Sequence, residues 1–474
     1  MTPASPPPMT LDWMPHSPQE MVLGHDIDLL ELFWRVKQSH AVCYLFESVS
    51  HPRHQDRFHV LGFAPAVELL ARDDTLTLTG CPDTIAQMTG QRVAELRIDG
   101  INPYTHIAQL RMDRGCRSHQ GGLIGFFSHE AMNYFEPAVD LAEHPDFATF
   151  RLGLYLDGLI LDTVTQSLSY YTFGADRSDE VRAMIAQMDG TAGGAVTTRY
   201  RGDSETRDSF LQKVADTQQK IFQGYSFQAE VGMKSRFDVA GDKFTLYRHL
   251  REVNPSPYMY YLQFGQQELF GASPEILISS KSGRVLTTPT AGTIHRGKDA
   301  SEDVILARKL LSDPKEIAEH NMLVDLHRND ISMVCQPGTV VVEDLMYLIK
   351  FSHVQHIVSN VVGVQARGKT AFDVLRCILP GGVVTGAPKI ETVKIIQRNE
   401  AQPRGPYGGA VGRFAFNGDC DFCMPIRSLF CNGDDCFAQT SAGVVYDSDP
   451  AHEYQEVQRK LAAMRTTLAA FGAD

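Results

Sequence analysis

The sequence lacks the features that would direct it to nucleic acid or to a membrane. Basic residues are in the minority, with 44 Lys and Arg against 57 Asp and Glu, and the net charge is −13. Such a composition gives no reason to expect nucleic acid or an anionic membrane as a partner. No apolar run reaches the roughly 20 residues of a bilayer span. The start of the chain has no basic segment followed by an apolar core, so no secretory signal is predicted.

Cysteine is scarce and scattered, with nine residues in the chain. The low, odd count favours a reduced protein in the cytoplasm. Four cysteines between residues 420 and 436 suggest zinc, but Asn-Gly pairs at 417–418 and 432–433 are hairpin signals that place these cysteines on strands. A separation of three puts Cys420 and Cys423 on opposite faces of a strand, which argues against a shared metal.

The chain of 474 residues is too long for one compact core and predicts two lobes. Short β-prone runs separated by turn residues occupy residues 41–48, 57–63, 66–72, 75–79 and 151–173. A stretch rich in Gly, Thr and charge at residues 190–207 indicates a boundary. We therefore expect a flexible, Pro-rich lead-in over residues 1–15, an N-terminal lobe over 16–200 and a second domain over 201–474.

Two helices of the second half carry paired carboxylates. Each is predicted by Ser-Asp-Pro, a capping side chain followed by proline in the first turn, at residues 312–314 and 448–450. The first helix carries Glu316 and Glu319, and the second carries Glu453 and Glu456. A spacing of three places each pair on one helix face, where carboxylate oxygens suit magnesium. The same spacing is common on solvated helices, so the pattern alone leaves both interpretations open.

Eleven short motifs follow one another in the second half. They read SFQ at 226–228, NPSPYM at 254–259, GASPE at 271–275, PTAGT at 289–293, EIAEH and VDLHRND at 316–330, SHVQH at 352–356, GAPK at 386–389, YGGAVG at 407–412, IR at 426–427 and AG at 442–443. Their identity and order resemble the chorismate-binding enzymes, which include anthranilate, aminodeoxychorismate, isochorismate and salicylate synthases. The resemblance implies an α+β fold of two lobes, built on large, mostly antiparallel β-sheets packed as a sandwich with helices outside.

The resemblance also implies roles for residues around chorismate and magnesium. Glu275 would protonate the leaving hydroxyl, and His356 would act as acid, base or orienting group in the later elimination. Glu316 and Glu453 would bind Mg²⁺ directly, with Glu319 and Glu456 holding coordinated waters. The expected substrate-binding positions are Gln228, Ala291, Gly292, Thr293, Tyr407, Arg427, Ala442 and Gly443. Among these, Tyr407 and Arg427 would hold the second carboxylate of chorismate.

Two positions favour one reaction within the family. Gln228 stands where isochorismate and salicylate synthases have a Lys that activates water, and an amide cannot serve as that base. Ala291 stands where aminodeoxychorismate synthases typically have a nucleophilic Lys, so ammonia has room to attack ring carbon 2 directly. Both favour a magnesium-dependent lyase that forms anthranilate and pyruvate in tryptophan biosynthesis. Ser441 departs from the glycine that is usual before the Ala-Gly motif.

The resemblance implies two further partners. The sequence contains no glutaminase nucleophile motif, so ammonia would come from a separate glutamine amidotransferase subunit. Residues 44–48, YLFES, resemble a segment that binds feedback tryptophan, and the candidate residues for that site are Glu47, Ser48, Pro257, Tyr258 and Met259. Two alternatives stay open. One is an aminodeoxychorismate or aminodeoxyisochorismate synthase subunit, and the other is a non-catalytic, tryptophan-binding regulatory subunit.

Overall fold

A computed structural model describes residues 8–49, 57–350 and 354–472. Two twelve-stranded sheets form its framework. The first sheet has the order β1 (Gln19–His25), β10 (Ser167–Thr172), β9 (Asp157–Asp162), β3 (Phe58–Phe63), β2 (Val42–Glu47), β13 (Tyr258–Phe264), β14 (Gln267–Ser273), β23 (Ser428–Asn432), β24 (Asp435–Val444), β12 (Gln228–Gly241) and β11 (Val196–Asp203), with β20 (Gly386–Ala387) beside β12. The named strands pair with their neighbours antiparallel, as in β12 and β24.

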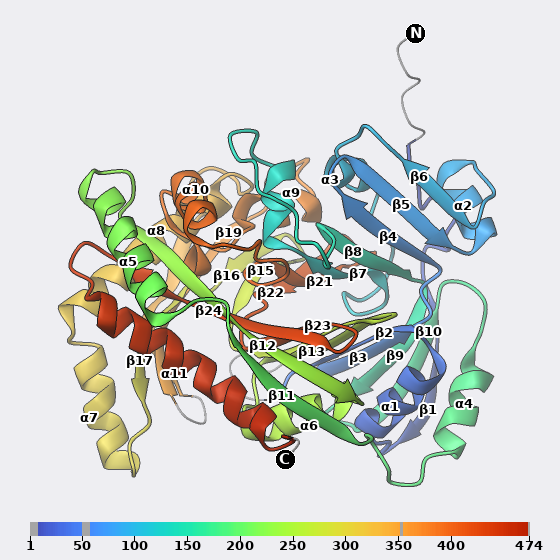
Figure 1. Ribbon diagram of the computed structural model, residues 1–474. Helices are drawn as coiled ribbons and strands as arrows, with labels where there is room; N and C mark the ends of the chain where they lie inside the picture. The colour runs from blue at the N-terminus through green and yellow to red at the C-terminus, as the bar shows by residue number, and fades with distance from the viewer. Residues whose placement is uncertain (1–7, 50–56, 351–353, 473–474) are drawn as a thin grey trace.

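The second sheet lies over the first as the other layer of the sandwich (Figure 1). Its order is β17 (Thr290–His295), β19 (Val354–Val364), β16 (Arg284–Thr287), β15 (Ile276–Lys281), β22 (Cys420–Cys423), β21 (Ala410–Phe414), β7 (Gly122–Phe127), β8 (Phe150–Tyr155), β4 (Val67–Arg72), β5 (Thr75–Gly80) and β6 (Glu95–Ile98), with β18 (Val341–Lys350) beside β19. The predicted sandwich of antiparallel sheets with helices outside is confirmed.

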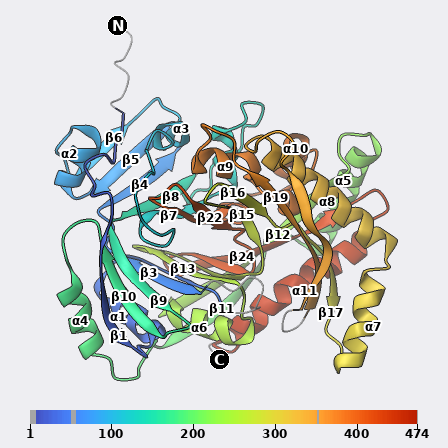
Figure 2. The same cartoon turned by 180° about the vertical axis from the view of Figure 1, so that it is seen from behind.

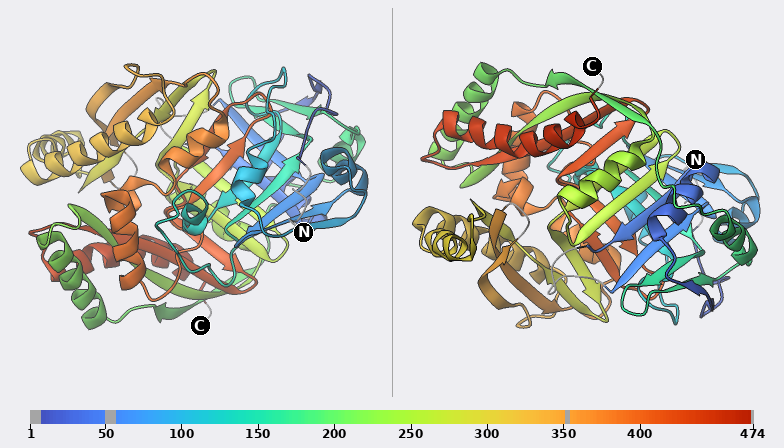
Figure 3. Two further views of the ribbon diagram at one scale, coloured as in Figure 1. Left: turned by 90° about the horizontal axis from the view of Figure 1, so that it is seen from above. Right: turned by 90° about the horizontal axis from the view of Figure 1, so that it is seen from below.

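Helices surround the two sheets (Figure 2). They are α1 (Leu29–Ser39), α2 (Pro82–Thr89), α3 (Pro103–Ile107), α4 (Ser178–Ala186), α5 (Arg207–Phe222), α6 (Lys243–Val253), α7 (Ala300–Leu310), α8 (Pro314–Ser332), α9 (Ala371–Ile378), α10 (Lys389–Asn399) and α11 (Pro450–Ala469), with 3₁₀ turns at His129–Tyr134 and Gly382–Val384. Helices α5 and α11 pack on β12 and β24, whereas α8 packs on β17 and β19. The view from above in Figure 3 shows these two groups on separate arms of the molecule.

The largest core lies between the sheets. Tyr260 and Leu262 of the first sheet belong to the same buried cluster as Leu69, Phe126 and Phe422 of the second. A separate buried cluster joins α1 and α6 to the opposite face of the first sheet, and a third joins α5 and α11 to β12 and β24. Burial of apolar area of this extent is the main source of the free energy of folding. The sandwich is therefore a rigid support for the side chains and helices at its edges.

Both sheets combine strands from the two halves of the sequence. Strand β2 pairs with β13, and β7 pairs with β21, so each sheet is continuous across the predicted lobes. The expected boundary at residue 200 falls within β11. The division of the sequence into 16–200 and 201–474 therefore does not correspond to the two layers, because long-range strand pairing is not visible in local composition.

The predicted flexible lead-in needs a correction over its described part. Residues 1–7 lie outside the described residues, but Met9, Leu11 and Met14 are buried in the core between the sheets. The backbone N–H of Thr10 also donates to the carbonyl oxygen of Met88. Apolar side chains, rather than the prolines around them, decide the position of this segment.

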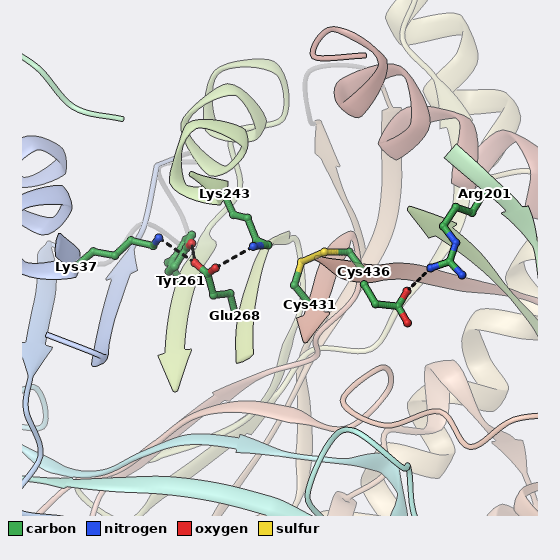
Figure 4. Close-up of a disulfide and its surroundings, with 8 residues drawn as sticks. Lys37, Arg201, Lys243, Tyr261, Glu268, Cys431 and Cys436 are labelled. Atoms are coloured by element: carbon green, nitrogen blue, oxygen red, sulfur yellow. Dashed lines mark hydrogen bonds and ion pairs between the residues drawn. A yellow bond between two sulfur atoms is a disulfide. The ribbon is translucent and has the colours of Figure 1, made fainter. Parts of the chain in front are cut away.

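The expectation of unpaired cysteines is wrong at one pair. Cys431 and Cys436 face each other across the hairpin of β23 and β24 and form a disulfide (Figure 4). The hairpin placement that argued against zinc agrees with the structure, since Cys420 and Cys423 are the two ends of β22. Figure 4 also shows the buried carboxylate of Glu268 between the ammonium groups of Lys37 and Lys243, at 3.0 and 3.3 Å.

No helix in the described part of the chain combines the length and the apolar character that a bilayer crossing requires.

Candidate active site

The four predicted metal-binding glutamates belong to the two predicted helices. Glu316 and Glu319 lie on α8, and Glu453 and Glu456 lie on α11. Burial and the carboxylates of Glu319 and Asp313 raise the pKa of Glu316 to about 7, and Glu456 acts on it in the same direction. Burial also raises the pKa of Glu319, to which Glu456 again contributes. The helices therefore direct carboxylates from different arms of the molecule toward a common region.

Capping side chains fix the first turns that carry these groups. Asp313 accepts hydrogen bonds from the backbone N–H groups of Lys315 and Glu316, and Asp449 accepts one from that of His452. In α11, donor atoms of His452, Glu453 and Glu456 all lie within 4.8 Å of one another. His452 was not among the predicted residues, although its spacing of four from Glu456 places both on one helix face.

These residues fit a hard divalent cation. Burial, with a contribution from the Glu456 carboxylate, raises the pKa of Glu316, Glu319 and Glu453, and a bound cation would relieve this concentration of carboxylates. Gly292 lies against this group, since a Cβ there would be 3.0 Å from Oε2 of Glu316, and its φ of +69° favours glycine. Ala291 and Thr293 flank it at a bulge in the pairing of β17 with β19.

Gln228 joins the glutamates from the start of β12. Its Nε2 donates to Oε1 of Glu319 over 3.0 Å. Its Oε1 is buried without a hydrogen-bond partner among the described residues, so an acceptor is directed at a bound molecule or water. Gly443 of β24 lies against it, because a Cβ there would be 2.2 Å from Gln228 Nε2. Ala442 points to the core beneath α5 and α11, so only its backbone is available for binding.

Glu275, His356 and Arg427 form a second, deeply buried group. Burial raises the pKa of Glu275 well above its usual value, and the Arg427 guanidinium and the Thr290 backbone N–H only partly oppose this. One carboxyl oxygen of Glu275 is buried and has no hydrogen-bond partner within the described part of the chain. The carboxyl group is therefore held as a neutral proton donor.

The hydrogen bonds of His356 define its tautomer. Nη2 of Arg427 lies 3.0 Å from Nε2 of His356, and a guanidinium can only donate. Nε2 is thus the acceptor, and Nδ1 carries the proton that it can donate to the carbonyl oxygen of Gly292 at 3.2 Å. Burial, followed by the charge of Arg427, lowers the pKa of His356 to about 3. Of its predicted roles, this arrangement favours orientation of Arg427.

Arg427 and Tyr407 approach the site from different elements. Arg427 has a φ of +51°, a strained conformation of the kind that is concentrated at functional sites. Its pKa is lowered to about 10 by burial, so it keeps its charge at neutral pH. Tyr407 contacts Oγ of Ser441 at 2.9 Å. The side chain of Lys460 is 44% exposed, and its ammonium acts on both groups. It adds to the lowering of the His356 pKa and opposes the rise that burial causes in the pKa of Tyr407.

Lys460 is the most prominent member of the site that the sequence interpretation missed. Its Nζ donates to the backbone oxygen of Ser441 at 2.9 Å and forms an ion pair with Glu456 at 2.8 Å. Burial acts to raise the pKa of Glu456, but Lys460 and other cations lower it on balance. The signal was present, because Lys460 follows Glu456 by four residues, the spacing of helical ion pairs.

The five predicted tryptophan-binding residues do not belong to this group. Glu47, Ser48, Pro257, Tyr258 and Met259 line one cavity of ≈ 60 Å³ between the two sheets, with β21 and β22 as the opposite wall. Glu47 is buried there, and it accepts a hydrogen bond of 2.7 Å from the hydroxyl of Tyr247. The five residues predicted to bind tryptophan thus share one cavity, whose lining includes none of the residues predicted to bind chorismate or the metal.

The fold, together with the glutamates of α8 and α11, defines a two-sheet enzyme scaffold with an acidic, partly buried site. Residues 68–466 match the family described as chorismate binding enzyme, and the chain belongs to this family. It is 39% identical over 453 residues to anthranilate synthase component 1 of Leptospira biflexa, covering 94% of this chain and 95% of the relative. It is also 39% identical over 365 residues to aminodeoxychorismate synthase component 1 of Bacillus subtilis strain 168, covering 74% and 77%. The crystal structure of anthranilate synthase component I from Streptococcus pneumoniae TIGR4 superposes with a TM-score of 0.74 at 29% identity, covering 88% of this chain and 93% of that one.

Proposed function

We propose that the protein is the catalytic subunit of an anthranilate synthase, which converts chorismate and ammonia to anthranilate, pyruvate and water. The observation that carries this proposal is the pair Gln228 and Ala291. Gln228 is fixed by its hydrogen bond to Glu319, and Ala291 is buried opposite Ile357, so neither position offers an amine. The nucleophile must then be ammonia itself. The extensive likeness to anthranilate synthase component 1 of Leptospira biflexa supports the same choice.

The buried carboxyl of Glu275 is the acid for the first step. Loss of the ring hydroxyl as water requires a proton, and general acid catalysis typically contributes two to four orders of magnitude. A pKa well above the usual value keeps that proton on Glu275 at neutral pH. Arg427, held by His356 at 3.0 Å, binds a substrate carboxylate. His356 itself is neutral, so it adds no charge near the donor.

The glutamates of α8 and α11 are proposed to hold Mg²⁺. Glu316 and Glu453 would bind the ion directly, with Glu319 and Glu456 around it, and the bound ion would offset the charge of the ring carboxylate. The acidic composition of the site and the raised pKa values of Glu316, Glu319 and Glu453 support this assignment. Gln228 then has two functions, because it orients Glu319 and directs its free amide oxygen into the site.

Ammonia is proposed to come from a glutamine amidotransferase subunit, and the cytoplasm is the proposed location. Tryptophan is the proposed inhibitor at the cavity between the sheets. The carboxyl group of Glu47, which also contacts Arg251 at 3.2 Å, can accept from an ammonium group, and the side chains of Met259 and Tyr258 suit an indole ring. A cavity of ≈ 60 Å³ holds a few waters, so binding of tryptophan would require the sheets to separate around it.

One assay tests the reaction. The purified chain is incubated with chorismate, magnesium and ammonium at alkaline pH, and the products are identified. Anthranilate and pyruvate in equal amounts are expected, with Glu453→Ala as a control that lacks one metal carboxylate. An aminated product that retains its enolpyruvyl arm would instead establish the aminodeoxy reaction of the first alternative. A folded protein that leaves chorismate unchanged would establish the regulatory alternative.

A further inference from the structure

A buried chain of hydrogen bonds leads from Glu230 through Ser441 to Tyr407. Oγ of Ser441 donates to Oε2 of Glu230 in a short hydrogen bond. The same Oγ lies 2.9 Å from the hydroxyl oxygen of Tyr407, where either atom can be the donor. All three side chains are buried. Oε1 of Glu230 borders the site as well, since a Cβ on Gly443 would lie 2.8 Å from it.

The number of protons in this chain determines its direction. A serine hydroxyl has one proton and two lone pairs, and an ionised carboxylate can only accept. When Glu230 is ionised, Ser441 must therefore donate to it. Tyr407 then donates its own proton to Ser441 and presents only lone pairs to a bound molecule, which repel a carboxylate.

A proton on Glu230 reverses the chain. The neutral carboxyl donates to Ser441, and Ser441 donates to the oxygen of Tyr407. The hydroxyl proton of Tyr407 is then free to point at a bound molecule. Burial raises the pKa of Tyr407 itself to about 12, so this residue keeps its proton in either arrangement.

The surroundings of Glu230 place its titration near neutrality. Burial raises the pKa of Glu230 to about 7; Lys460 and the hydrogen bond from Ser441 oppose the rise, and Glu319 and Glu456 add to it. Arg404 faces the same residue and donates from Nη2 to its backbone oxygen at 3.3 Å. These groups come from α11, from α8 and from the loop after α10.

We propose that Glu230 and Ser441 are positioning residues, which together set Tyr407 as a hydrogen-bond donor to the side-chain carboxylate of the anionic substrate when Glu230 is protonated. This inference rests on the proposed function, in which Tyr407 contacts chorismate. The proton comes from solvent, and no covalent bond changes. Substrate affinity is thereby tied to the protonation of one buried carboxyl group, and the serine that replaces the family's usual glycine makes that link.

The test is the pH dependence of chorismate binding. The dissociation constant is measured by calorimetry with magnesium and without ammonia between pH 6.5 and 8.5, and KM and kcat are measured separately with ammonia. In the natural protein, raising the pH ionises Glu230 and weakens binding, by up to about tenfold per pH unit above the pKa. In Glu230→Gln the amide can always donate to Ser441, so the pH dependence of the dissociation constant and of KM should disappear.

Two further variants distinguish a relay from a structural role. Ser441→Ala interrupts the chain, so Glu230→Gln should have no added effect on binding in that background. Glu130→Gln is the matched control, because Glu130 is also buried with a pKa raised to about 7 but bonds to Gly405 instead. It should keep the pH dependence of the natural protein.

Other outcomes separate the two proposals. If Glu230→Gln binds chorismate with an unchanged pH dependence, the relay is refuted even though anthranilate is formed. If the natural protein forms no anthranilate, the proposed function fails, and the binding titration still decides the relay. Should Glu230→Gln fail to fold, as judged by circular dichroism, Ser441→Ala alone must abolish the pH dependence.

Discussion

At the scale of single residues, the surroundings of each buried carboxyl group decide its chemistry. Glu268 is buried between Lys37 and Lys243 and forms two ion pairs. Glu275 is equally buried, but burial dominates the nearby charge of Arg427, and its pKa rises. Removing one partner of a buried ion pair destabilises a fold, whereas a neutral, unpartnered carboxyl is suited to give up a proton.

We therefore predict that Glu275→Gln loses catalysis but keeps substrate binding. The amide fills the same space and cannot donate a proton to a leaving hydroxyl, so kcat should fall by about two orders of magnitude or more. The dissociation constant of chorismate, measured by calorimetry without ammonia, should change by less than about threefold. Glu130→Gln provides the comparison for the replacement of another buried carboxyl group by an amide, and it should retain kcat. Equal losses of kcat and affinity in Glu275→Gln would show that this residue holds the substrate rather than protonating it.

Some residue-scale features could be predicted from the sequence, and others could not. Gln228 and Ala291 were identifiable because each stands within a short motif. Glu230 could not be identified in this way. It is one of the first eight residues of β12, all of which are buried, and no motif marks this glutamate as part of a site. Its partner Ser441 lies 211 positions away. Contacts at such a separation depend on strand register, which local sequence does not specify.

At the scale of elements, α8 and α11, the two helices that carry the paired glutamates, depend on their N-terminal caps. The Ser-Asp-Pro segments correctly predicted both helix starts, because an Asp cap and a proline in the first turn act through local geometry. The two helices end at Ser332 and Ala469. The cap of α11 fixes the turn that carries Glu453.

Removal of this cap should affect stability and metal use together. Asp449→Ala leaves the backbone N–H of His452 without its acceptor, which should lower the free energy of unfolding by about 1 kcal/mol. The frayed first turn should also raise the magnesium concentration needed for half-maximal turnover. Denaturant unfolding and a magnesium titration measure the two effects. Asp449→Asn retains a side-chain acceptor and should remain close to the natural protein; if the Ala variant matches it in both measurements, the cap does not position the metal site.

At the scale of the whole molecule, the sandwich is assembled from both halves of the sequence. The cavity predicted for tryptophan illustrates the consequence, because Glu47 comes from β2, Met259 from β13 and Arg413 from β21. Composition could indicate two lobes and the family motifs could indicate the sandwich, but neither could show that β2 pairs with β13 and β7 with β21. These pairings make the N-terminal residues part of the framework that supports the catalytic group.

Neither half should therefore fold by itself. A break between residues 192 and 193 lies in the segment before β11 and avoids both sheets. Expressed separately, residues 1–192 and 193–474 would each expose the unpaired edges of β2 and β7, or of β13 and β21, together with the apolar face between the sheets, so each should aggregate. Expressed together, the two fragments should pair, remain in solution and form anthranilate from chorismate, magnesium and ammonium. A full-length chain cut at the same position after purification controls for the break itself. A fragment 193–474 that unfolds in one cooperative thermal transition and turns over chorismate alone would contradict this prediction, because catalysis would then need no strand from the N-terminal half.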